Sequence, residues 1–127
     1  MTFKIKELND LIVWQKSHKL ALKIYELTRS FPKEEKFWLV SQMRRCAVSV
    51  LSNMAEGFKR KGYKSGLSFF NINDASLAEL KYQTLLSLDL EYLTSNQYDE
   101  VQELEGEVGR LLNGWQRNYY SKTTVVS

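Results

Sequence analysis

The sequence predicts an all-α fold, namely an up-down-up-down antiparallel four-helix bundle. Apolar residues recur every three or four positions in four long segments, and no long segment shows the alternating pattern of a strand. The 127 residues suit one domain, and the chain holds only one proline and six glycines. Because the connections between the four segments are short, successive helices are expected to run antiparallel.

The boundaries of the elements follow from breaker and cap residues. Pro32 follows the first periodic segment, and Gly62 follows the second. Thr94 and Gln97 have the spacing of a capping box ahead of the fourth. The sequence therefore predicts a single domain over 1–127, with helices at about 11–30, 35–61, 65–93 and 96–122 and a frayed tail at 123–127.

The third predicted helix is apolar on two opposite sides. One side carries Ile72, Leu86 and Leu90, and the other carries Phe70, Leu77 and Leu88. A helix that is apolar on two sides is buried on two sides, whereas a lone four-helix bundle leaves one side of each helix in water. We therefore expect a homo-oligomer, in which Phe70, Leu77 and Leu88 are structural or interface residues.

The second predicted helix carries a polar stripe opposite its apolar side. The stripe includes Arg45, Ser49, Asn53 and Glu56, spaced three or four residues apart. The small Ser49 and the neighbouring Ser52 would let another backbone approach closely, which suits a subunit interface as well as a solvated surface. These residues are therefore interpreted as structural or interface residues.

Arg44 is the exception, because it falls inside the apolar sector of the second helix. A buried guanidinium needs a partner, since leaving it unpaired costs several kcal/mol. Glu79 and Asp89 on the third helix are the candidate partners. Alternatively, Arg44 lies at the edge of the sector and extends to water, or it reaches a neighbouring subunit.

The net charge of +3 is unevenly distributed: residues 1–64 carry +8 and residues 65–127 carry −5. Such a chain can present a basic surface to a polyanion, but the two halves can equally neutralise each other across the bundle. Candidate nucleic-acid contacts lie along the first helix and at the end of the second. They are Lys16, Lys19, Lys23, Lys59, Arg60, Lys61 and Lys64.

Signals for an enzyme or a metal site are poor. The single cysteine, Cys46, excludes an internal disulfide and a multi-cysteine metal site, and a packed thiol is the simplest interpretation. The single histidine, His18, is interpreted as an exposed bystander. No phosphate-binding glycine loop, signal peptide or membrane span is recognised. We expect a cytoplasmic protein without cofactors.

The motif SQMRRCAVSVLSNMAEG at residues 41–57 resembles the signature of a known family. Further matches are L-x-V-W-Q at 11–15, FPKEEK at 31–36 and S-L-x-E-L at 76–80. Over about 8–115 the chain is similar to the 23S rRNA intervening-sequence proteins, a bacterial family of small four-helix bundles. One departure is Leu51, where the family often has proline, so an uninterrupted helix is expected here.

The resemblance implies more than the residues themselves do. Relatives resemble the accessory variability determinant of diversity-generating retroelements, which forms a basic pentameric ring and binds nucleic acid and a reverse transcriptase. By this resemblance the motif residues Arg44, Arg45, Asn53 and Glu56 either hold the fold and a ring together or contact a ligand.

Two functional hypotheses follow. The first is a non-enzymatic, ring-like homo-oligomer, with a pentamer favoured by the resemblance, that binds RNA or DNA through backbone charge and assists a reverse transcriptase. The second is a protein-binding scaffold whose basic charge is incidental. A carboxylate-based enzyme is the remaining alternative.

Overall fold

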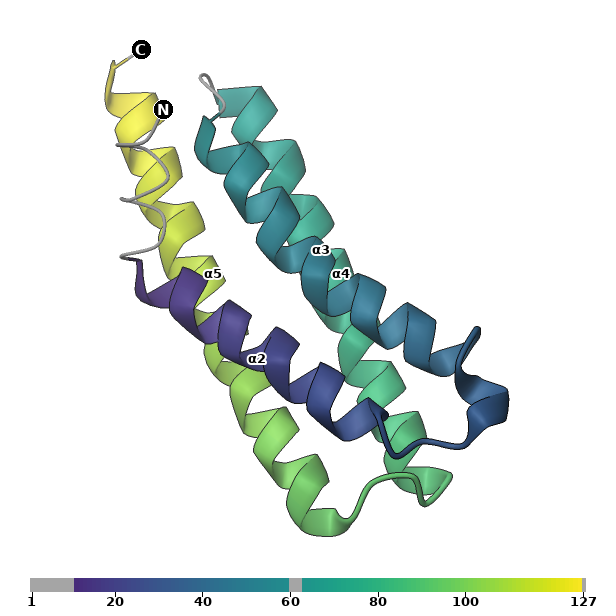
Figure 1. Ribbon diagram of the computed structural model, residues 1–127. Helices are drawn as coiled ribbons and strands as arrows, with labels where there is room; N and C mark the ends of the chain where they lie inside the picture. The colour runs from purple at the N-terminus through teal and green to yellow at the C-terminus, as the bar shows by residue number, and fades with distance from the viewer. Residues whose placement is uncertain (1–10, 60–62, 127) are drawn as a thin grey trace.

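The computed structural model describes residues 11–59 and 63–126, and every regular element among them is helical (Figure 1). The elements are α2 (Ile12–Thr28), the 3₁₀ turn η1 (Lys33–Glu35), α3 (Leu39–Lys59), α4 (Tyr63–Asp89) and α5 (Ser95–Val126). The predicted all-α class with four helices is confirmed. The four helices lie side by side (Figure 1), so that α2 contacts α3 and α5, and α4 contacts the same two helices.

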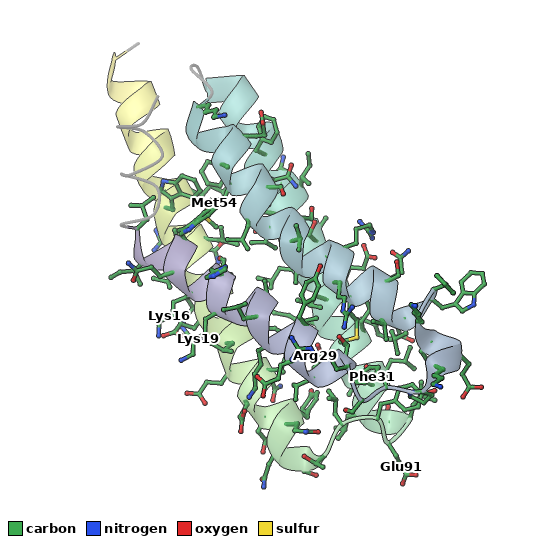
Figure 2. All side chains as sticks on the ribbon, in the orientation of Figure 1. Lys16, Lys19, Arg29, Phe31, Met54 and Glu91 are labelled. Atoms are coloured by element: carbon green, nitrogen blue, oxygen red, sulfur yellow. The ribbon has the colours of Figure 1, made fainter. Side chains whose placement is uncertain are left out.

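The core lies between the four helices and follows the apolar periodicity of the sequence. Its fully buried centre is formed by large aliphatic side chains from every helix. They include Leu20, Ile24, Met43, Met54, Leu80, Val108 and Leu112. Figure 2 places Met54 in the upper part of the bundle.

The first two helix boundaries differ from the predicted ones by a few residues. α2 ends at Thr28, where the hydroxyl of Thr28 donates to the Ile24 carbonyl oxygen at 2.7 Å. Pro32 then begins a 3₁₀ turn, so α3 starts at Leu39 instead of near 35. α3 passes through Leu51 without interruption, as expected for a chain that lacks the family's proline at this position.

α4 ends at Asp89, four residues before the predicted end. Glu91 adopts a positive φ of 65°, and the backbone N–H groups of Glu91 and Tyr92 donate to the carbonyls of Leu88 and Ser87. These two bonds form a Schellman motif, which usually has glycine at the left-handed position. With glutamate there, the sequence carried no recognisable stop signal.

The capping box ahead of α5 is confirmed. The backbone N–H of Gln97 donates to the Thr94 hydroxyl at 3.1 Å, and the backbone N–H of Thr94 donates to the Gln97 side-chain oxygen at 2.9 Å. α5 continues to Val126, past the expected end at 122. No proline or glycine follows Gly114, so nothing in the sequence interrupts the helical hydrogen bonds. The helix stop predicted at Gly62 lies outside the described residues.

Candidate functional site

α4 is turned so that many of its apolar residues face away from the bundle. Polar residues occupy the side that packs against the other helices, namely Asn73, Ser76, Gln83, Thr84 and Ser87, all of which are buried. The opposite side, called here the outer face of α4, consists of Ile72, Tyr82, Leu85 and Leu90. Their side chains are 43%, 62%, 42% and 44% exposed, respectively. This face is a candidate interaction surface, since it leaves large apolar groups in water.

The sequence predicted two apolar sides for this helix, and the structure distinguishes them. Phe70 and Leu77 belong to the core of the same chain, where the Phe70 ring meets Trp115 edge-on with a centroid distance of 5.0 Å. Leu88 is half-buried. The chain therefore accounts for the burial of Phe70 and Leu77 without a partner. On the other predicted side, Leu86 packs against the core, whereas Ile72 and Leu90 are left exposed.

The polar stripe of α3 lies along α4. The Ser49 and Ser76 hydroxyls share a hydrogen bond of 3.1 Å, and the Asn53 amide donates to the Ser49 hydroxyl and carbonyl at 2.9 and 2.8 Å. One turn earlier in α3, Arg45 Nη2 and Glu79 Oε2 form an ion pair of 2.9 Å. The close approach predicted at Ser49 is therefore made by α4 of the same chain.

The helices approach closely at the upper end of this seam. A Cβ added to Gly57 would lie 3.2 Å from the Cβ of Phe69, so glycine is needed for α4 to come this near. Ser52 and Glu56 lie on the exposed side of α3. Among the motif residues of α3, then, Arg45 and Ser49 bond directly to α4, and Asn53 bonds to Ser49 within α3.

The partner predicted for Arg44 was wrong. Arg44 Nε donates to the Thr28 hydroxyl at 3.0 Å, Nη2 donates to the Tyr25 carbonyl at 3.4 Å, and the guanidinium lies 4.6 Å above the Tyr25 ring. The residue thus faces α2 and not α4, where Glu79 instead pairs with Arg45. The helical wheel gave the direction of Arg44 but not which neighbour lies on that side.

The lysines of α2 lie beside an acidic row on α5. Lys16 pairs with Glu107 at 3.4 Å, and Lys23 pairs with Glu100 at 2.6 Å. Hydrogen bonding to Glu100 raises the pKa of Lys23. A groove of about 500 Å³ runs between the two helices and includes Lys19 in its lining, and Figure 2 shows Lys16 and Lys19 on this side of the molecule. The two halves of the chain therefore neutralise each other here, which leaves little free positive charge on α2.

The second basic cluster is only partly described. Lys59 is exposed in the last turn of α3. Arg60 and Lys61 lie outside the described residues, and Lys64 belongs to the first turn of α4.

Glu105 is a buried carboxyl group that the sequence analysis did not single out. Its side chain is 2% exposed, and the Thr84 hydroxyl contacts it at 2.7 Å. The same hydroxyl lies 2.9 Å from the Leu80 carbonyl oxygen, which can only accept. One hydroxyl proton cannot serve both acceptors, so a neutral Glu105 that donates to Thr84 satisfies the whole chain of bonds.

Burial raises the pKa of Glu105 to about 7, although Thr84 and the Lys81 charge both act in the opposite direction. Lys81, Tyr98 and Gln102 line a cavity of about 250 Å³ beside it, which gives the carboxyl group a path to solvent. The missed signal was an acidic residue at an apolar-periodic position between Val101 and Val108.

The remaining candidates behave as structural residues. Cys46 is fully buried in the core, and burial raises the pKa of its thiol to about 11, so the predicted packed thiol is confirmed. His18 is exposed on α2. Over 11–59 and 63–126, no group of three acidic, histidine or cysteine side chains is arranged to hold a metal. In the same part of the chain, none of the helices has the length and apolarity required to cross a membrane.

These features define a small four-helix protein with an unpartnered apolar surface. Residues 9–114 match the family described as 23S rRNA-intervening sequence protein, and the chain belongs to that family, as its motifs indicated. A solved structure with a TM-score of 0.76 and 25% sequence identity is a protein of unknown function from the S23 ribosomal protein family of Bacteroides thetaiotaomicron. The similarity covers 84% of this chain and 96% of that one. A comparison with curated proteins finds no match.

Proposed function

We propose that this protein is a non-enzymatic scaffold whose copies associate through the outer face of α4. The observation that carries the proposal is the arrangement of this helix, which buries Asn73 and Gln83 while it exposes Tyr82, Leu85 and Leu90. Full burial of one leucine side chain is worth about 1.5–3 kcal/mol, so covering these half-exposed groups yields a substantial driving force.

Family resemblance favours a pentameric ring as the form of the assembly, with a cytoplasmic location. Closed rings arise when one surface of a subunit meets a different surface of the next, and they leave no apolar surface uncovered. The proposed ring would present its basic helix ends several times over.

Light scattering coupled to size exclusion tests the association directly. The proposal expects an oligomer at micromolar concentration and a monomer for Leu85→Lys, because a charge on the outer face of α4 would have to lose its hydration at the interface. Leu22→Lys is a matched control, since Leu22 is also an exposed leucine but lies on α2. A wild-type protein that stays monomeric at this concentration refutes the proposal.

A second candidate function is binding of RNA or DNA through the phosphate backbone, as an accessory of a reverse transcriptase. It is favoured by the charge of +8 on residues 1–64 and by the exposed Lys59 next to Arg60 and Lys61. With Lys16 and Lys23 paired to glutamates, this cluster together with Lys64 is the better candidate surface.

Filter binding of single- and double-stranded RNA and DNA over a salt series tests this second candidate. Backbone binding predicts an affinity that falls steeply with salt and decreases for Lys59→Glu. Lys33→Glu, which changes an exposed lysine in η1, is the control. No affinity at low salt would eliminate this function and leave the scaffold proposal intact.

A further inference from the structure

A second apolar surface lies where α3 meets α2. It is a groove of about 480 Å³, called here the α2–α3 groove. Its lining residues are Tyr25, Lys36, Phe37, Val40, Ser41, Arg44, Arg45 and Val48. Phe37 is 76% exposed and Val48 is 40% exposed, so the groove leaves an aromatic ring and an aliphatic side chain in water.

The α2–α3 groove is positively charged. Lys36, Arg44 and Arg45 belong to its lining, which contains no acidic residue. Because Arg45 is also ion-paired with Glu79 of α4 at 2.9 Å, Lys36 and Arg44 carry the positive charge of the groove. Lys36 Nζ lies 5.4 Å from the centroid of the Phe37 ring, and the bond from Arg44 to Thr28 holds the guanidinium in place. The groove is therefore apolar with cationic groups at fixed positions, and it suits a partner surface that is apolar and acidic.

The outer face of α4 has this complementary character. Exposed acids accompany its apolar residues, with Asp89 and Glu91 on either side of Leu90. Glu91 lies in the turn that follows α4, and Figure 2 shows it pointing away from the bundle. A single chain thus carries an acidic apolar surface and a basic apolar surface.

The two surfaces cannot meet within one chain. Arg44 faces α2 through its bond to Thr28, whereas Ser49 faces α4 through its bond to Ser76, so the groove and the outer face of α4 lie on different sides of the bundle. From this arrangement we infer that the outer face of α4 in one copy docks into the α2–α3 groove of the next copy. The inference rests on the proposed self-association and assigns the second half of the interface.

An interface between two different surfaces has a definite consequence. Each copy that joins leaves one groove and one α4 face free, so assembly continues into a closed ring or, where the rotation between copies does not close, into an open filament. Contact between two identical α4 faces would instead stop at a dimer.

Two variants, each of which blocks one surface, test this pairing. Val48→Glu places a negative charge in the α2–α3 groove and leaves α4 unchanged, whereas Leu85→Lys places a positive charge on α4, against the basic groove, and leaves the groove unchanged. Both positions are exposed, so circular dichroism should show the wild-type helix content. Leu22→Lys, on the side of α2 that faces α5, is the control and should assemble as the wild type does.

The inference predicts that each variant alone is monomeric in light scattering. An equimolar mixture should form a one-to-one dimer, because the intact groove of Leu85→Lys accepts the intact α4 of Val48→Glu. The pairing is overturned if Val48→Glu assembles as the wild type does, or if the mixture stays monomeric. Either of these results leaves self-association through α4 standing, whereas a monomeric wild type removes both proposals.

Discussion

Replacing Glu105 by glutamine should remove a pH-dependent part of the stability of the protein. In the folded chain the pKa of Glu105 is raised from 4.5 to about 7, mainly by burial. At a pH between these two pKa values, Glu105 is ionised in the unfolded chain and still protonated in the folded chain. The free energy of unfolding therefore falls as the pH rises through this interval, by about 1.4 kcal/mol per pH unit, or about 3 kcal/mol in all.

Below pH 4.5 both states are protonated, and above pH 7 both are ionised, so the contribution of Glu105 is constant on either side. Glutamine mimics the neutral acid, since its amide can donate to the Thr84 hydroxyl while Thr84 donates to the Leu80 carbonyl. Glu105→Gln should match the wild type near pH 4.5 and exceed it at pH 8 by on the order of 1–3 kcal/mol.

Urea unfolding followed by circular dichroism at pH 4.5 and pH 8 measures this difference. Protein concentration is kept constant, because association contributes to the apparent stability. The control is Glu103→Gln, an exposed glutamate on the same helix, which should show the same difference from the wild type at both pH values. If Glu105→Gln also differs from the wild type equally at both pH values, the carboxyl group is not held neutral in the fold.

Four further substitutions probe the fold, each measured by urea unfolding at pH 7. Glu91→Gly should stabilise the chain by about 0.5–1 kcal/mol, because glycine adopts the positive φ without strain; a loss of stability would contradict the Schellman motif. Thr94→Ala should cost about 1 kcal/mol through loss of the capping box, and an unchanged midpoint would refute that role. Arg44→Ala should cost about 1.5–3 kcal/mol and Arg45→Ala less than about 1, because only Arg44 bonds to the buried Thr28; the reverse order would contradict these assignments.

The helices could be predicted from the sequence because each is long, strongly periodic and bounded by recognisable residues. The capping box at Thr94 was found for this reason. The end of α4 was not, since Glu91 occupies a backbone conformation that glycine usually marks. Propensity alone could not place this stop, because the turn is stabilised by backbone hydrogen bonds to Ser87 and Leu88.

The environment of individual side chains was harder to predict than the helices. Periodicity identified two apolar sides on α4, but tertiary packing decided that Phe70 and Leu77 face inward and Ile72 and Leu90 face outward. The buried side of α4 also carries a row of polar side chains, so hydrophobicity along the sequence could not show which side of this helix faces the core. Which helix lies beside each side of α3 is likewise a property of the packed bundle, and this is why the partner of Arg44 was misassigned.

The uneven charge distribution allowed two interpretations, namely a basic surface for a polyanion and mutual neutralisation of the two halves of the chain. Opposite charges in the two halves of the chain do pair, at Lys16 and Lys23 with α5. The α2–α3 groove had no comparable signal, since Phe37 and Val48 look like ordinary apolar residues until the path of the chain is known.

Sedimentation equilibrium of the wild type and of Leu85→Lys over a concentration series tests the central claim most directly. Association through the outer face of α4 predicts a wild-type mass several times the 14.9 kDa of one chain and a single-chain mass for the variant. Equal masses for the two proteins, whether both are monomeric or both are oligomeric, would contradict it.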